Sequence, residues 1–132
     1  MDWLKIIEKS LDSFLLAAKY FYTEKEYRSL IFTELFNSCT DEYFCGKFHI
    51  KRLYDFFDSV NLRIAIHPEY YRNGINWNYQ ITWYLPKEEW DKNLYNGTPY
   101  YGDNAEYPSR IEAEYAAFTQ AFLLLEEIIK NK

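Results

Sequence analysis

The 132-residue sequence is poor in residues that interrupt folded structure. It holds four Gly and four Pro, too few for long linkers or low-complexity tracts. It lacks an apolar run long enough to span a bilayer, and Asp2, Glu8 and Asp12 in its first stretch argue against a secretory signal peptide. On both grounds we expect a cytoplasmic protein, in which its two cysteines, Cys39 and Cys45, are reduced thiols.

An excess of positive charge is also missing. The net charge is −5 and the estimated pI is 5.1, which argues against binding to phosphate backbones. The charge is uneven, because residues 47–72 hold five Lys/Arg against three Asp/Glu, whereas residues 1–46 and 103–132 each have a net charge of −3. A small basic patch on an acidic body is therefore expected.

Aromatic residues are abundant. Fourteen Tyr, ten Phe and four Trp make up 21% of the chain. Phe belongs mostly in the core, whereas Tyr and Trp carry a polar group and often lie at a core edge or in a binding surface. The composition fits a recognition surface or a small core filled with rings, and both readings stay open.

Apolar spacing predicts four helices. A stripe with spacings of three and four residues indicates one helix of about twenty residues; its members are Leu4, Ile7, Leu11, Phe14, Ala18 and Phe21. Thr23 and Glu26 form a capping box that starts a second helix. A third is expected over residues 49–59. The last runs from Ser109 to about Lys130 and begins with the capping box of Ser109 and Glu112.

Two alternating segments, residues 62–66 and 77–85, predict strands joined through Asn73-Gly74, the favoured two-residue hairpin turn. That turn predicts a register in which paired residue numbers sum to 147. The predicted apolar pairs are Leu62–Leu85, Ile64–Trp83, Ile66–Ile81 and Tyr70–Trp77. The predicted polar pairs are Arg63–Tyr84, Ala65–Thr82, His67–Gln80 and Glu69–Asn78. Pro68 indicates that the first strand lies at an edge or is bent, and Thr98–Tyr101 is a candidate third strand.

Together these elements predict a single α+β domain over residues 1–132. N-terminal helices precede a helix, a β-hairpin with a possible third strand, and a long C-terminal helix packed on a small antiparallel sheet. Trp77, Tyr79 and Trp83 are expected in the core beneath the helices.

The run from Ser109 to Ala117, Ser-Arg-Ile-Glu-Ala-Glu-Tyr-Ala-Ala, resembles the C-terminal helix of small uncharacterised phage and mobile-element proteins of Bacteroidetes type. That resemblance implies no known activity. The same helix and the element order also resemble double-stranded RNA-binding domains. Those domains place Lys at the start of this helix, whereas Arg110, Ile111, Glu112 and Glu114 occupy these positions here. The likeness therefore implies topology and not RNA binding.

Candidate chemistry is sparse. Cys39, Cys45, His49 and His67 are possible zinc ligands, but their spacing matches no common zinc motif. A Cys45–His49 nucleophile pair has no orienting third group. The acidic pairs lie on predicted helices, where solvated faces explain them; they are Asp55/Asp58, Glu112/Glu114 and Glu126/Glu127. We expect no enzyme activity, metal or cofactor.

The leading hypothesis is a non-catalytic protein that binds another macromolecule, most plausibly a protein, as a phage- or mobile-element-encoded modulator of a host. A small-molecule or carbohydrate-binding domain is the alternative. A weak nucleic-acid binder is the third hypothesis, through Lys47, Lys51, Arg52, Arg63 and Arg72. The candidate binding residues are Arg63, His67, Tyr71, Tyr84, Tyr100 and Tyr101. A homodimer through the hairpin edge or the first helix stays open, and no membrane association is expected.

Overall fold

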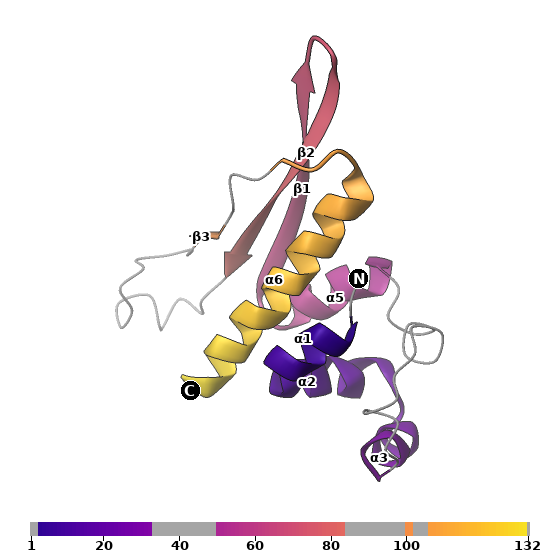
Figure 1. Cartoon of the computed structure of the whole chain (residues 1–132). Coiled ribbons are helices and arrows are strands. Elements are labelled where there is room, and N and C mark those ends of the chain that lie inside the picture. Colours follow the sequence, from indigo (N-terminus) through magenta and orange to yellow (C-terminus); the bar gives the residue numbers. More distant parts are fainter. Residues whose placement is uncertain (1–2, 33–49, 84–99, 102–105, 132) are drawn as a thin grey trace. The chain divides into compact units, whose positions relative to one another are not determined.

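The computed structural model in Figure 1 describes residues 3–32, 50–83, 100–101 and 106–131. The helices are α1 (Trp3–Lys9), α2 (Leu11–Phe21), α3 (Glu24–Phe32), α5 (Ile50–Ser59) and α6 (Arg110–Lys130). The strands are β1 (Leu62–Tyr71), β2 (Gly74–Trp83) and β3 (Tyr100–Tyr101). The predicted α+β class is confirmed, with an antiparallel hairpin and a long C-terminal helix.

The chain divides into two compact units, and the boundaries fall within α5 and α6. Unit 1 comprises Met1–Phe56 and Phe122–Lys132, and unit 2 comprises Phe57–Ala121. Phenylalanine rings build the core of unit 1. The ring of Phe122 lies 6.0 Å from that of Phe14 and 6.4 Å from that of Phe56, measured between centroids. Phe21 packs on Phe56 at 6.1 Å, so α2, α5 and the end of α6 share this core.

The prediction of one uninterrupted first helix is wrong, because the helix breaks at Ser10. This residue adopts φ −144° and ψ 50°, which separates α1 from α2. Its hydroxyl donates to the carbonyl of Ile6 instead of capping α2. The break reorients the helix that follows, so Leu11 of the predicted stripe is exposed, whereas Ser10 and Ser13 are fully buried. Apolar spacing missed this face because two of its members are serines.

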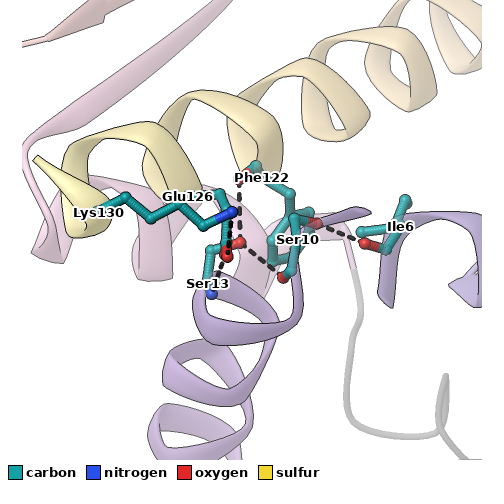
Figure 2. A network of polar contacts seen from close by, with 6 residues as sticks. All are labelled: Ile6, Ser10, Ser13, Phe122, Glu126 and Lys130. Atoms are coloured by element: carbon teal, nitrogen blue, oxygen red, sulfur yellow. Dashed lines mark hydrogen bonds and ion pairs between the residues drawn. The ribbon is translucent and has the colours of Figure 1, made fainter. Parts of the chain in front are cut away.

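A buried carboxylate supplies the cap that Ser10 does not. Figure 2 shows Glu126 of α6 beside the first turn of α2, where its Oε2 accepts the backbone N–H of Ser13 at 2.8 Å. The Ser13 hydroxyl lies 2.9 Å from the carbonyl oxygen of Phe122 and 3.0 Å from that of Ser10. Lys130 Nζ lies 3.6 Å from Glu126 Oε1. A negative group at a helix N-terminus satisfies an orphan N–H and complements the helix dipole.

We predict that Glu126→Ala lowers the free energy of unfolding by about 1–3 kcal/mol, because the buried N–H of Ser13 then has no acceptor. Glu126→Gln keeps an acceptor oxygen and should cost less. The neighbouring exposed Glu127 gives a matched control, and Glu127→Ala should leave the urea midpoint almost unchanged. Equal midpoints for the alanine variants at 126 and 127 would contradict this role.

In unit 2 the hairpin register differs from the prediction by two residues. The pairs run from Leu62↔Trp83 to Tyr71↔Gly74, so paired numbers sum to 145. The turn residues are therefore Arg72 and Asn73, and Gly74 opens β2 with φ +147°. Apart from glycine, only Asn61 among the described residues has a positive φ, so Asn73 does not adopt the positive φ of the predicted turn. A shift of two leaves every side chain on its predicted face, which is why the alternation fitted both registers.

A second backbone contact fixes the hairpin from its other side. The N–H of Trp77 donates to the carbonyl of Tyr107 at 2.9 Å, and the N–H of Tyr107 donates to the carbonyl of Trp77 at 2.8 Å. Because both backbone groups of Trp77 point to Tyr107, its pair with Pro68 in β1 is not hydrogen-bonded. Pro68 thus costs no bond between β1 and β2. The sheet order β1-β2-β3 places β1 at an edge, as Pro68 indicated.

At the other end of β2, Tyr101 and Tyr100 pair with Ile81 and Thr82. These are two residues of the candidate third strand, and Thr98 and Pro99 lie outside the described residues. On the apolar face of the hairpin, the side chains of β1 become more exposed from Leu62 towards the turn. Leu62, Ile64, Tyr79 and Ile81 are buried in the core of unit 2, together with the α6 residues Ala113, Ala117, Phe118 and Ala121. Trp77 and Trp83, predicted as core, are half-buried.

Two helices begin at capping residues that the sequence predicts. The Thr23 capping box is confirmed, because Glu26 N–H donates to Thr23 Oγ1 at 3.3 Å and Thr23 N–H donates to Glu26 Oε1 at 3.2 Å. Ser109 caps α6 through the N–H of Glu112 at 3.2 Å. The structure thus confirms the predicted start of the C-terminal helix.

We predict that Gly74→Ala destabilises the protein by about 1 kcal/mol or more, because an L-residue rarely adopts a φ of +147°. Backbone strain is the whole cause, since an added Cβ meets no atom within 4 Å. Asn73→Ala in the same turn should cost less, and chemical denaturation compares the two. An unchanged midpoint for Gly74→Ala would show that the turn does not need this conformation.

Candidate functional site

Three of the six predicted binding residues lie along one face of the hairpin. Arg63, His67 and Tyr71 lie at odd-numbered positions of β1, so they share the polar face, and all three are exposed. Tyr84 lies outside the described residues. Tyr100 and Tyr101 form β3, but their side chains lie outside the described part of the chain. The candidate site is therefore built on β1 and β2.

Hydrogen bonds between side chains run across this polar face. His67 Nε2 lies 3.2 Å from Gln80 Oε1, and Asn78 Nδ2 donates to Glu69 Oε1 at 2.8 Å. Both pairs were predicted to lie directly opposite each other. In the observed register they are diagonal neighbours, which is still within reach of these side chains.

Near the turn, the polar face of the hairpin includes the carboxylate of Glu106, which comes from a segment distant in the sequence. The hydroxyl of Tyr71 donates to Glu106 Oε1, and Asn76 Nδ2 donates to Glu106 Oε2 at 3.2 Å. Because Tyr107 pairs with Trp77 on the side of β2 away from β1, Glu106 also lies on that side. The side chain of Tyr71 therefore extends over β2, near Gly74, which has no side chain.

Electrostatics at this point favour the neutral phenol. The hydrogen bond to Glu106 raises the pKa of Tyr71 above its ordinary value, and lost hydration and the negative charges of Glu106 and Glu69 raise it further. The end of the polar face nearest the turn is thus negatively charged.

The end of the hairpin exposes large side chains on both faces. Tyr70 is 76% exposed, Tyr71 47% and Ile75 45%, and Tyr70 and Ile75 are cross-strand partners on the apolar face. In Figure 1 the turn of the hairpin projects beyond the start of α6. We call this region the tip surface; its residues are Glu69, Tyr70, Tyr71, Ile75, Asn76 and Glu106.

Of the tip surface, only Tyr71 is among the six candidate binding residues predicted from the sequence. Tyr70 was assigned to a covered apolar face, but burial does not extend to the turn. Glu106 gave no signal, because its position depends on the pairing of Tyr107 with Trp77.

Other expectations about charged residues need correction. Solvated faces do not explain all the acidic pairs, because Glu114 and Glu126 are buried; Glu114 is paired with Arg110 at 3.3 Å. The described basic residues are divided between the two units. Lys51 and Arg52 belong to unit 1, Arg63 and Arg72 belong to unit 2, and Lys47 lies outside the described residues.

The potential metal ligands give no described site. Cys39, Cys45 and His49 lie outside the described residues, and His67 is on the polar face of the hairpin. Among the residues that were described and searched, no group of three or more His, Cys, Asp or Glu residues is arranged to hold a metal ion. The tip surface instead combines two carboxylates, an amide and exposed rings, which suit hydrogen bonding and packing against a partner.

We predict that Glu106→Gln lowers the pKa of Tyr71 towards its ordinary value of about 10. The difference in ultraviolet titration between the parent protein and Tyr71→Phe isolates this tyrosine, and the same difference in a Glu106→Gln background measures the change. Because the folded-state pKa is raised, the stabilising contribution is complete below about pH 10 and is lost as the pH rises through the folded-state pKa. An identical Tyr71 titration with and without Glu106→Gln would refute the assignment.

Comparison with known proteins gives no family for this chain. No protein-family model matches it. Neither the curated proteins nor the solved structures give a match. Within the described residues, no helix has the length and apolar character needed to cross a membrane. The case for a function therefore depends on the geometry of the hairpin.

Proposed function

We propose that this protein is a non-catalytic interaction protein that binds another protein through the tip surface of its β-hairpin. The observation that carries the proposal is the exposure of Tyr70, Tyr71 and Ile75 at the end of a long hairpin. Tyrosine is enriched among the residues that dominate binding energy in protein interfaces, because it gives a large contact area for few rotatable bonds. Two tyrosines and an isoleucine around one turn form a compact centre for an interface.

Preorganisation supports the same function. The hydroxyl of Tyr71 is held by Glu106, and the other oxygen of Glu106 is held by Asn76. A ring that is already fixed loses less conformational entropy on binding than a mobile one. The hairpin backbone adds rigidity, since β1 and β2 pair over ten residues each.

A protein partner is favoured over the two alternative ligands. The amides of Asn76 and Asn78 already donate to carboxylates of the same face, which leaves them less available to the hydroxyl groups of a sugar. Nucleic-acid binding needs clustered positive charge, whereas the tip surface carries two carboxylates. We place the protein in the cytoplasm, and the phage-like C-terminal helix suggests a modulator of a host protein.

We predict that a photoreactive benzophenone amino acid in place of Tyr70 forms a covalent adduct with one partner protein in cells that produce this chain. Tyr20 on α2 gives a control, because it is the same type of side chain, 47% exposed, and belongs to unit 1. The same amino acid at Tyr20 should give no such adduct. Mass spectrometry of the adduct identifies the partner, and Ile75→Glu should abolish the product at Tyr70.

Two results would count against the proposed function. One is the absence of an adduct at Tyr70, or the same products from positions 70 and 20. The other is turnover of a substrate by the purified chain that does not depend on the tip surface.

A further inference from the structure

The tip surface carries negative charge that no cation of the described chain neutralises. Among the described residues, Glu69 and Glu106 accept their hydrogen bonds from neutral groups, namely the side chains of Asn78, Tyr71 and Asn76, and form no ion pair. Arg72, in the adjacent turn, is exposed and forms no ion pair with either carboxylate. Each carboxylate oxygen has two lone pairs, so one hydrogen bond leaves it able to accept another.

The two carboxylates lie on opposite sides of β2. Glu69 is on β1 directly opposite Asn76, whereas Glu106 approaches Asn76 from the side of β2 that pairs with Tyr107. The side chain of Tyr71 extends over β2 between these two positions. Glu106 accepts hydrogen bonds from Tyr71 and from Asn76, the cross-strand partner of Glu69, so the ring and both carboxylates are grouped around Asn76.

This arrangement selects one kind of cation. A guanidinium group is planar, stacks on an aromatic face and donates up to five hydrogen bonds in fixed directions. It can therefore make a cation–π contact with a ring and a charge-assisted hydrogen bond to a carboxylate at the same time. A lysine ammonium is a compact, strongly hydrated point charge and makes less use of a flat ring beside two carboxylates.

We propose that the tip surface binds an arginine-bearing segment of a partner protein, with the guanidinium group against the ring of Tyr71 and hydrogen-bonded to Glu69 and Glu106. Tyr70 and Ile75, on the opposite face of the hairpin end, contact apolar side chains that flank the arginine. The inference rests on the proposed function and adds the chemistry of the partner, which the uncompensated charge of the tip surface determines.

The test uses the full-length chain and a display library of random peptides. Peptides are selected on the parent protein, and those that lose binding to Tyr70→Ala are retained as ligands of the tip surface. We expect arginine to be enriched in this set. Replacing that arginine with citrulline, its neutral counterpart, should weaken binding about tenfold or more, since charge-assisted hydrogen bonds are lost.

A matched pair of double variants separates local charge from net charge. Glu69→Gln/Glu106→Gln should weaken the selected peptides about tenfold or more. Asp55→Asn/Asp58→Asn removes the same two charges from exposed positions of α5 and should leave binding unchanged. Thermal unfolding checks that each variant is folded, and the citrulline comparison needs no variant at all.

The outcomes distinguish the inference from the function on which it rests. Peptides of the tip surface that lack arginine, or that bind equally with citrulline, overturn the arginine assignment and leave a protein-binding tip in place. Failure to select any peptide that depends on Tyr70 also counts against the inference. The proposed function is judged separately, by the adduct at Tyr70 and by the absence of substrate turnover.

Discussion

The two hydrogen bonds between Trp77 and Tyr107 are the contact on which unit 2 depends. They use both backbone groups of Trp77, so they fix which residues of β1 and β2 exchange hydrogen bonds and leave Pro68 where a donor is not needed. They also determine on which face of the sheet the side chains of Tyr107 and Glu106 lie. Tyr107 lies near Tyr79, with ring centroids 6.3 Å apart, and Glu106 is directed to the polar face. Since α6 begins at Arg110, the same contact fixes where the long helix leaves the sheet.

Unit 1 depends on a contact of another kind. Its phenylalanine core is apolar, yet the junction of α2 with α6 is made by two buried serines and the carboxylate of Glu126. Burying these groups is costly unless each finds a partner, and none of the buried side-chain polar atoms among the described residues lacks one. Such a network is more specific in geometry than ring packing, because it requires Ser13 and Glu126 to meet in one relative position.

The sequence allowed prediction wherever a local rule had one solution. Pro108 and the capping serine determine the start of α6, and alternation determines the two faces of the hairpin. Prediction failed where two solutions shared the same pattern, as for the registers summing to 147 and 145, which place every side chain on the same face. It also failed where distant residues decide the outcome. At the break after α1, the cap of α2 comes from Glu126, far away in the sequence, and Glu106 reaches Tyr71 through the pairing of Tyr107.

Pro68 has a consequence for how the sheet can grow. Along β1, the backbone N–H and C=O groups of alternate residues point towards β2 or away from it. The backbone of Pro68 points away, because its partner Trp77 forms its hydrogen bonds with Tyr107. An additional strand laid along β1 would therefore find no donor near the middle of the edge, where it would otherwise gain one. This protects a ten-residue edge strand from edge-to-edge aggregation. Recognition at the hairpin is accordingly left to side chains rather than to main-chain extension of the sheet.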